Sequence, residues 1–174
     1  MAQSTIKIIL IGLDNSGKSS IALCLQRKNN LSNFTSLGPT RGHEVLRFRD
    51  KKTKTKISIW DLGGQKQHRT RHIEKLADEF SVGASKLIYV IDVQDSARYD
   101  LSLDYFKKVL KELQKVEIDI DISVFLHKYD PNIDFDEEQI STLMKKIKTI
   151  IPPTFEFNIF KTSIHTIFSK KLAY

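Results

Sequence analysis

The stretch Ile6–Ser19, IKIILIGLDNSGKS, decides the fold of this chain. Its first half is apolar except for Lys7, which is typical of a strand buried in the centre of a sheet. Its second half, Gly12–Ser19, has a glycine, four residues and then Gly-Lys-Ser, the pattern of a phosphate-binding loop, or P-loop. A helical pattern, Lys18–Arg27, follows at once. Strand, glycine-rich loop and helix in this order predict an α/β protein that binds a phosphorylated ligand.

Five further short apolar runs, six with the first, alternate with helical or loop segments along the rest of the chain. Glu44–Phe48 and Lys56–Leu62 alternate with period two around the polar turn Arg49–Thr55, which predicts an antiparallel hairpin. Further strands are expected at Leu87–Val93, Ile120–Leu126 and Phe155–Phe160. Helices are expected at Lys18–Arg27, Ile73–Phe80, Leu101–Leu113, Asp136–Ile150 and Ser163–Leu172. This order predicts a six-stranded, mostly parallel sheet with helices on both faces, which binds ligands beyond the carboxyl ends of its strands.

Length and composition indicate one globular domain spanning residues 1–174, because 40% hydrophobic and 28% charged residues are ordinary for such a domain. The single cysteine, Cys24, excludes an internal disulfide and favours a reducing cytoplasm as the location. It falls in the apolar phase of the first helix, which predicts a thiol in the core. No signal peptide, transmembrane segment or lipid anchor is expected, since no apolar run approaches the roughly 20 residues needed and Ala2 cannot be myristoylated.

The net charge of +7 is distributed over the chain, with its densest groups at Arg47–Lys56 and Lys66–Arg71. We interpret the first group as a solvated hairpin tip and the second as a candidate surface for a protein partner. Neither group is interleaved with a series of aromatic residues, so no nucleic-acid partner is expected. The sequence leaves peripheral membrane contact and dimerisation open.

The P-loop pattern has a chemical reason at each fixed position. Gly12 and Gly17 allow backbone angles that a side chain would forbid, so that backbone N–H groups can surround a β-phosphate. Lys18 would reach the β- and γ-phosphates, and Ser19 would offer a hydroxyl to Mg²⁺. The ligand-binding residues expected from this segment are Asp14, Asn15, Ser16, Gly17, Lys18, Ser19 and Ser20.

Two further segments suit recognition of the γ-phosphate. Asp61 ends a buried strand within Trp60–Gln65, WDLGGQ, where a carboxylate is costly unless a partner such as Mg²⁺ compensates it. Gly64 would bring a backbone N–H to the γ-phosphate, and Gln65 would orient the attacking water as the catalytic residue. Thr40, in the loop before the hairpin, would complete the magnesium ligands Ser19, Thr40 and Asp61.

The end of the fifth strand suits recognition of a base. In His127–Asp130, HKYD, the carboxylate of Asp130 can accept hydrogen bonds from N1–H and the exocyclic amine of guanine, two donors that adenine lacks at those positions. The aliphatic part of Lys128 can lie along the base. Ser163 and Ile164, in KTSI, would direct backbone N–H groups at guanine O6.

The ordered set GLDNSGKS, PT, WDLGGQ, HKYD and TSI resembles the nucleotide-binding boxes of Ras-like small GTPases, over Ile6 to about Phe168. The first three boxes are similar to the Arf and Arf-like family, whereas HKYD, LIYVIDV and FKTSI are similar to the Rag family. The resemblance implies a P-loop NTPase G domain that binds GTP or GDP with Mg²⁺. It also implies that His127 replaces the asparagine that ties the base loop to the P-loop.

The resemblance implies a molecular switch that hydrolyses GTP slowly, with an exchange factor, a GTPase-activating protein and effectors as partners. No arginine finger is evident in cis, since Arg41 and Arg69 are interpreted as solvated loop charges. One alternative is a scaffold that stays locked to GTP or GDP with negligible hydrolysis. Another is an ATP-using P-loop enzyme, against which Asp130 and WDLGGQ argue.

Overall fold

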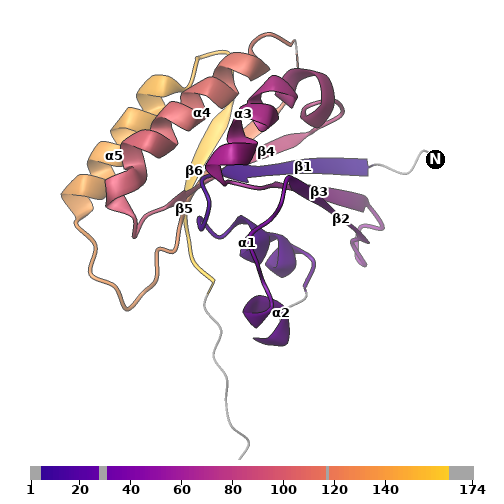
Figure 1. Ribbon diagram of the computed structural model, residues 1–174, viewed down its shortest axis with the longest axis horizontal. Coiled ribbons are helices and arrows are strands. Elements are labelled where there is room, and N and C mark those ends of the chain that lie inside the picture. The colour runs from indigo at the N-terminus through magenta and orange to yellow at the C-terminus, as the bar shows by residue number, and fades with distance from the viewer. Residues whose placement is uncertain (1–4, 28–30, 117, 165–174) are drawn as a thin grey trace, which may run out of the picture.

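A six-stranded sheet forms the centre of the computed structural model, which describes residues 5–27, 31–116 and 118–164. The strands lie in the order β2-β3-β1-β4-β5-β6, all parallel except β2, which pairs antiparallel with β3 (Figure 1). Their bounds are β1 Thr5–Gly12, β2 His43–Arg49, β3 Lys56–Leu62, β4 Lys86–Asp92, β5 Asp121–His127 and β6 Phe157–Thr162. The predicted fold class is therefore confirmed.

Helices cover both faces of the sheet (Figure 1). The helices α3, α4 and α5 lie over one face, and α1 with the short α2 lies over the other. Their bounds are α1 Lys18–Leu25, α2 Leu31–Thr35, α3 Lys66–Glu74, α4 Tyr99–Leu113 and α5 Glu137–Ile150. A π-helical turn, η1, spans Leu76–Phe80, and a 3₁₀ turn, η2, spans Ser96–Arg98. None of the helices in the described part of the chain is both long and apolar enough to cross a bilayer.

The core is divided in two by the sheet, because successive side chains of a strand point to opposite faces. On β1, Ile9 and Ile11 join the larger cluster under α4 and α5, whereas Leu10 joins the smaller cluster under α1. In the larger cluster the rings of Tyr89 and Phe106 stack with centroids 4.2 Å apart. The Tyr89 hydroxyl donates to the Ser102 carbonyl at 2.7 Å, so its burial leaves no unpaired donor.

Three local predictions were wrong. The helix expected at Ile73–Phe80 begins earlier, as α3 at Lys66, and its expected span is divided between the end of α3 and the π-helical turn. The short α2 was not predicted. Cys24 lies half-buried in the last turn of α1, beside the exposed Leu25, and not in the core. Most of the expected helix at Ser163–Leu172 lies outside the described residues.

The strand order decides where the sequence motifs meet. The parallel strands β1, β3, β4 and β5 end at the same edge of the sheet, where ligands bind in folds of this kind. The P-loop follows β1, Asp61 lies near the end of β3, and His127 ends β5. Helix α5 packs beside α4 on one face of the sheet. Its N-terminus is capped by Asp136, whose carboxylate accepts from Gln139 N at 3.0 Å.

Candidate functional site

The loop between β1 and α1 is shaped by two glycines. A Cβ added to Gly12 would lie 2.3 Å from the Val90 carbonyl oxygen, so no side chain fits there. Gly17 has a φ of 91°, and a Cβ there would lie 2.5 Å from the ring of His127. Asn15 also adopts a left-handed conformation, with a φ of 60°. The chain therefore turns tightly around the start of α1, as the P-loop pattern predicts.

Lys18 holds a buried positive charge at this turn. Its residue is 5% exposed, and its Nζ donates to the Leu13 carbonyl at 2.6 Å and to Ser16 Oγ at 3.3 Å. Burial lowers the pKa of Lys18 to about 8, partly offset by the carboxylates of Asp61 and Asp14. A bound anion would compensate this desolvation, so the site favours a negatively charged ligand next to Lys18.

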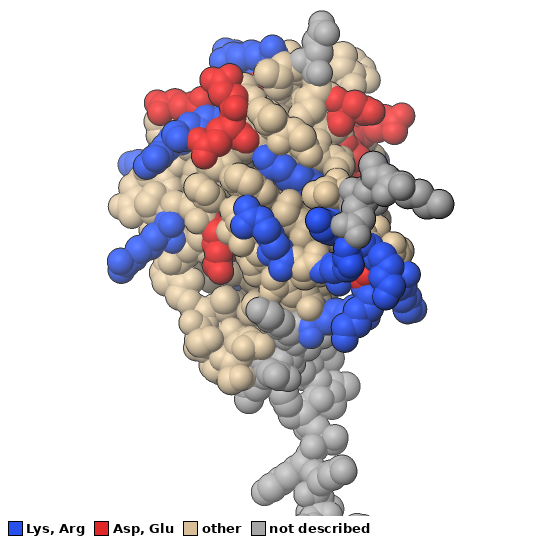
Figure 2. Space-filling model, turned by 90° about the vertical axis from the view of Figure 1, so that its right-hand side faces the viewer, with Lys and Arg blue, Asp and Glu red and all other residues tan. Residues whose placement is uncertain are grey.

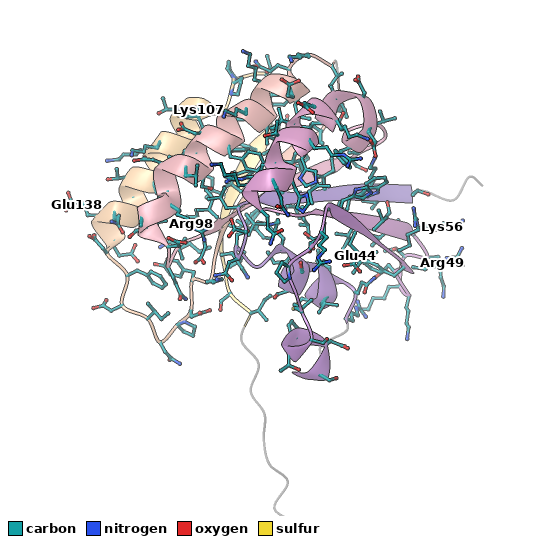
Figure 3. All side chains as sticks on the ribbon, viewed as in Figure 1. Glu44, Arg49, Lys56, Arg98, Lys107 and Glu138 are labelled. Atoms are coloured by element: carbon teal, nitrogen blue, oxygen red, sulfur yellow. The ribbon has the colours of Figure 1, made fainter. Side chains whose placement is uncertain are left out.

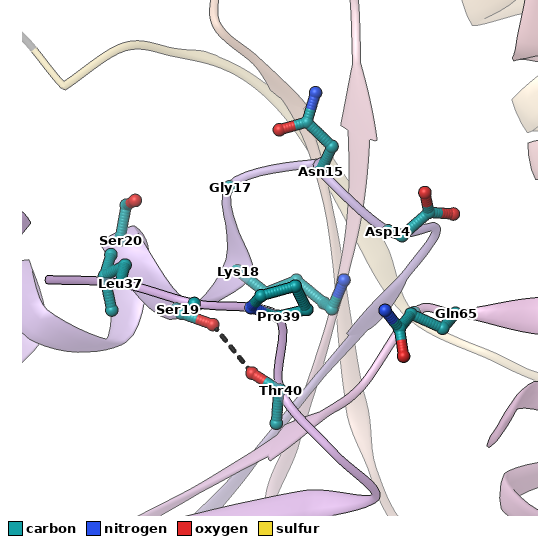
Figure 4. Close-up of a pocket in the computed structure, with 12 residues that line it drawn as sticks. Asp14, Asn15, Gly17, Lys18, Ser19, Ser20, Leu37, Pro39, Thr40 and Gln65 are labelled. Atoms are coloured by element: carbon teal, nitrogen blue, oxygen red, sulfur yellow. Dashed lines mark hydrogen bonds between the residues drawn. The ribbon is translucent and has the colours of Figure 1, made fainter. Parts of the chain in front are cut away.

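A cavity of about 330 Å³ opens beside Lys18, within the range of small-ligand sites. Three segments far apart in the sequence form its walls: the P-loop, the loop before β2 and the loop after β3 (Figure 4). The lining residues are Asp14, Asn15, Gly17, Lys18, Ser19, Ser20, Leu37, Gly38, Pro39, Thr40, Gly64 and Gln65. The predicted binding residue Ser16 does not line this cavity, and its hydroxyl instead donates to the Leu13 carbonyl at 2.9 Å.

Three oxygen-bearing side chains converge at one end of this cavity. Ser19 Oγ lies 2.5 Å from Asp61 Oδ2 and 3.1 Å from Thr40 Oγ1, which in turn lies 3.3 Å from Asp61 Oδ2. Figure 4 shows the Ser19 and Thr40 hydroxyls facing each other. Asp61 is 1% exposed, and its Oδ1 has no hydrogen-bond partner among the described residues. Two hydroxyls and a carboxylate with a free buried oxygen fit a hard cation such as Mg²⁺.

The WDLGGQ segment packs directly against the other two walls. A Cβ at Gly64 would lie 2.2 Å from Asp14 N, and one at Gly63 would lie 2.4 Å from the Thr40 carbonyl oxygen. Gly63 N also donates to the Gly42 carbonyl at 2.8 Å. These contacts place Gln65 at the mouth of the cavity, on the side where Asp14 lies.

The helix α3 joins the same arrangement through His72. This imidazole is 2% exposed, forms a hydrogen bond with the Gly42 backbone, and packs its ring edge to face with Phe80 at 5.6 Å. Burial lowers the pKa of His72 to about 4, so the ring is neutral near pH 7. The loop before β2 and the last turn of α3 are thus linked through Gly42.

Asp130 lies just beyond the end of β5, with both carboxylate oxygens oriented by side chains. Its Oδ1 accepts from Ser163 Oγ, and its Oδ2 accepts from Gln94 Nε2 at 2.8 Å. The same Gln94 amide donates to the Lys128 carbonyl at 2.8 Å. Each oxygen keeps a second lone pair, so the carboxylate can still accept two N–H groups from a ligand.

Lys128 and His127 connect this end of the site to the sheet. Lys128 has a φ of 62°, and its Nζ pairs with Asp92 Oδ2 at 2.7 Å. The buried His127 ring packs on Gly17, and its Nδ1 lies 3.0 Å from Thr162 Oγ1. His127 therefore ties the P-loop to β5 and β6, the role that the resemblance implies for the residue it replaces.

The known proteins most informative for this chain are G proteins. Residues 7–170 match the Gtr1/RagA G protein conserved region. The chain belongs to the Gtr1/RagA family of G proteins. The predicted resemblance to Ras-superfamily GTPases with Rag-like and Arf-like features is thereby confirmed.

Relatives of this G protein include both a GTR1 protein and Arf-like proteins. It is 33% identical over 144 residues to GTP-binding protein GTR1 of Saccharomyces cerevisiae, covering 81% of this chain and 45% of the relative. It is 32% identical over 110 residues to ADP-ribosylation factor-like protein 2 of Dictyostelium discoideum, covering 63% of this chain and 54% of the relative. The chain thus spans about half the length of these two relatives.

A solved structure supports the fold of this G protein. The Arl6 BBS3 small GTPase from Trypanosoma brucei, determined with the bound nucleotide analogue GppNp, superposes with a TM-score of 0.69. The superposition covers 92% of this chain and 87% of the other, at 22% sequence identity. A likeness at this level of identity establishes the architecture of the G domain.

The structure brings the predicted residues of this G protein together in two groups. The first group lines the cavity or lies at the end where Ser19, Thr40 and Asp61 converge, and the second surrounds Asp130. Ser163 belongs to the second group through its bond to Asp130, whereas the Ile164 side chain packs against the smaller core cluster. Arg41 is exposed, as expected of a solvated loop charge. Arg69 differs from that expectation, because it lies half-buried on α3 with its guanidinium 5.7 Å from the centroid of the Tyr105 ring.

Sequence reasoning missed two residues of the loop after β4. Gln94 contacts Asp130, as described above. The Arg98 guanidinium contacts the P-loop, where Nη1 lies 3.2 Å from Asp14 Oδ1 and Nη2 lies 3.3 Å from the Asp14 carbonyl oxygen. Its Nε donates to Asp95 Oδ2 at 2.5 Å, which fixes the orientation of the guanidinium group. Both residues follow the end of a strand, which was the one sequence signal for a role in the site. No motif distinguishes them from ordinary loop residues.

Proposed function

We propose that this G protein binds GTP and GDP with Mg²⁺, hydrolyses GTP slowly, and acts as a molecular switch. One observation carries the proposal: Lys18, Ser19 and Thr40 line one cavity, and the Asp61 carboxylate lies within hydrogen-bond distance of the two hydroxyls. A triphosphate needs a positive charge beside it, and its divalent cation needs oxygen ligands, so this arrangement suits both. The approach of Asp130 to the same edge of the sheet adds a group that selects guanine.

Each wall of the cavity would have its own part in binding. The P-loop N–H groups and Lys18 would neutralise the phosphates, helped by the N-terminal end of α1. Ser19, Thr40 and Asp61 would hold Mg²⁺, directly or through water, and the ion would supply charge neutralisation between the phosphates. Gly64 N–H would approach the γ-phosphate, and the Ser163 hydroxyl would keep the Asp130 carboxylate oriented toward the base.

Hydrolysis would use a water molecule that Gln65 orients. The water oxygen attacks the γ-phosphorus, the bond from that phosphorus to the bridging oxygen of GDP breaks, and the proton of the water leaves with the phosphate. No arginine of the described residues lines this cavity, so the intrinsic rate should be slow. A partner that inserts an arginine would accelerate the reaction by about 10³- to 10⁵-fold.

The switch would act through the two loops that contact the γ-phosphate. Both loops meet at Gly42, where Gly63 N and His72 form hydrogen bonds, so ordering one would order the other. We expect an exchange factor, a GTPase-activating protein and effectors to bind these loops and the start of α3. We propose the cytoplasm as the compartment in which they meet.

The experiment that tests the proposal is analysis of the nucleotide that co-purifies with the protein, followed by single-turnover GTP cleavage. We expect bound guanine nucleotide, slow cleavage to GDP and phosphate, and loss of cleavage when a chelator removes Mg²⁺. Co-purifying adenine nucleotide, or competition by ATP and not by GTP, would refute guanine specificity. Tight binding without any cleavage, even with an activating partner, would favour the locked scaffold.

Replacing Gln65 with leucine is expected to slow GTP cleavage by about 10-fold or more and to leave nucleotide affinity within about threefold, because leucine cannot orient water. Single-turnover cleavage and nucleotide titration on the same preparation separate the two effects. The control is Gln114→Leu, an exposed position at the end of α4 that does not line the cavity. Unchanged cleavage in Gln65→Leu would mean that another group places the water.

Replacing Arg98 with glutamine is expected to weaken GTP binding more than GDP binding, by about three- to tenfold in the ratio. Asp14 lines the cavity beside Gly64, on the side proposed for the γ-phosphate, and Arg98 compensates its charge. Without that compensation, the half-exposed carboxylate repels the additional phosphate. Competition titrations of GDP and a non-hydrolysable GTP analogue measure the ratio.

The matched control removes the repulsion itself. In the Asp14→Asn background, Arg98→Gln should leave the ratio of GTP to GDP affinity within about twofold, because there is no charge to compensate. An equal loss for both nucleotides in each background would show that Arg98 supports only the shape of the loop.

A further inference from the structure

The turn between β2 and β3 gathers an unusual share of the positive charge of the chain. Residues 47–56, which we call the basic tip, contain six cations and one carboxylate, against a net charge of +7 for the whole chain. Figure 2 shows Lys and Arg side chains crowding the lower right of one face, and Figure 3 shows Arg49 and Lys56 projecting from the end of this hairpin. The cations are Arg47, Arg49, Lys51, Lys52, Lys54 and Lys56, and the carboxylate is Asp50.

The cations of the basic tip are exposed and form no ion pair with the part of the chain that the structure describes. Among the described residues, no carboxylate forms an ion pair with any of the six, and all six are exposed. Asp50 is instead engaged within the turn, where its Oδ1 accepts from Lys52 N at 3.0 Å and from Thr53 N at 2.7 Å. Its Oδ2 lies 3.8 Å from Arg27 Nη2. The basic tip therefore presents uncompensated positive charge to its surroundings.

Protection of the sheet edge accounts for only part of this charge. β2 is an edge strand, and charged side chains on an edge prevent pairing with other strands. Arg47 and Arg49 lie on that strand and suit this role. Lys51, Lys52 and Lys54 lie in the turn, outside the paired region, where no strand could be added.

We propose that the basic tip docks on the surface of a membrane that contains anionic phospholipid. Clusters of four to eight Lys and Arg residues on one exposed element suit the phosphate and carboxylate headgroups of such a surface. Phe48 is the one aromatic residue of the segment, and it packs against the smaller core cluster, so no exposed ring offers stacking to nucleic-acid bases. A turn without an exposed apolar side chain also lacks the apolar centre of a protein interface.

The position of the basic tip makes membrane contact compatible with switching. In the β2–β3 ladder, Arg49 faces Lys56 at the tip, and His43 faces Leu62 at the other end, next to the cavity. The tip and the cavity beside Lys18 thus lie at opposite ends of the hairpin. A protein docked by its tip would leave the cavity and its loops free for partners. The proposal does not depend on the nucleotide assignment.

The experiment measures binding of the full chain to vesicles of phosphatidylcholine with about a third phosphatidylserine, and to vesicles of phosphatidylcholine alone. The test variant combines Arg47→Gln, Arg49→Gln, Lys51→Gln and Lys52→Gln. The matched control combines Lys108→Gln, Lys111→Gln, Lys145→Gln and Lys148→Gln, which removes the same charge from exposed positions of α4 and α5. A milder variant, Lys51→Gln with Lys52→Gln, changes the turn alone. Thermal midpoints and nucleotide affinity report whether each variant is folded.

We expect the native chain to bind the anionic vesicles and not the neutral ones. Each cation should contribute about fivefold to partitioning, so the test variant should lose about 100-fold or more and the turn variant about 25-fold. The control should keep binding within about threefold, and salt should weaken the native interaction. An equal loss in the control, or no binding by the native chain, would overturn the proposal.

Two competing anions distinguish the lipid surface from other sources of phosphate. Inorganic phosphate should displace the protein from vesicles no more than sodium chloride of the same ionic strength. Stronger displacement would indicate a site for free phosphate and would overturn the lipid assignment. Tighter binding to duplex DNA than to the vesicles at the same salt concentration would overturn it as well.

Discussion

Replacing Lys18 with alanine is expected to lower the affinity for both GTP and GDP by about 100-fold or more. Charge-assisted hydrogen bonds are worth roughly 1.5–3 kcal/mol each, and a buried ammonium would make them to phosphate oxygens without competition from water. Lys18 is 5% exposed and faces the cavity, so the described fold offers it such an environment. Titration with a fluorescent guanine nucleotide measures the loss.

The fold should survive this substitution, which keeps the experiment interpretable. The Leu13 carbonyl that accepts from Lys18 also accepts from Ser16 Oγ at 2.9 Å, so alanine leaves no unpaired backbone acceptor. Without nucleotide, the thermal midpoint of Lys18→Ala should equal or exceed that of the native chain, because burial disfavours the charged lysine. Lys108→Ala, an exposed position on α4, is the control. Retention of full affinity in Lys18→Ala would contradict the phosphate assignment.

The positions that ligand chemistry restricts were predictable from the sequence. Gly12 is required by the close approach of the Val90 carbonyl, and Gly17 by its positive φ and the nearby His127 ring. The P-loop pattern contains both glycines. Asp61 was predictable because a carboxylate at the end of a buried strand needs a partner, and the structure places two hydroxyls beside it. Asp130 was predicted for a different reason, because a carboxylate after a strand end can accept from the two donors that guanine presents. Parallel strands then bring these residues to one edge without any further information.

The features that depend on tertiary contacts were not predictable. Helix α3, KQHRTRHIE, has almost no apolar periodicity, and it packs through the buried His72 and the half-buried Arg69. Gln94 and Arg98 acquire their roles only when β4 places its following loop between Asp130 and the P-loop. A single sequence offers no local signal for such pairings, because each partner lies more than 30 residues away.

Replacing Asp130 with asparagine is expected to reverse the preference between guanine and xanthine, with a change of about 1000-fold in the affinity ratio of GTP to xanthosine triphosphate. The carboxylate would accept from N1–H and the exocyclic amine of guanine. An asparagine amide keeps one acceptor and gains a donor, which suits the carbonyl that xanthine carries in place of the amine. Guanine loses the charge of the carboxylate and one hydrogen bond, whereas xanthine gains a hydrogen bond from the amide, so both changes shift the ratio in the same direction.

The contacts of Asp130 define the controls for this substitution. In Asp130→Asn, Ser163 Oγ would still donate to the remaining side-chain oxygen, so the side chain keeps its orientation, whereas the Gln94 amide must turn to offer its oxygen. Ser163→Ala and Gln94→Ala should each weaken GTP binding by about three- to tenfold without any gain for xanthosine triphosphate, because the carboxylate remains. Competition titrations with the two nucleotides measure all three variants. If Asp130→Asn leaves the affinity ratio of GTP to xanthosine triphosphate unchanged, the Asp130 carboxylate accepts nothing from the base, and the base binds elsewhere.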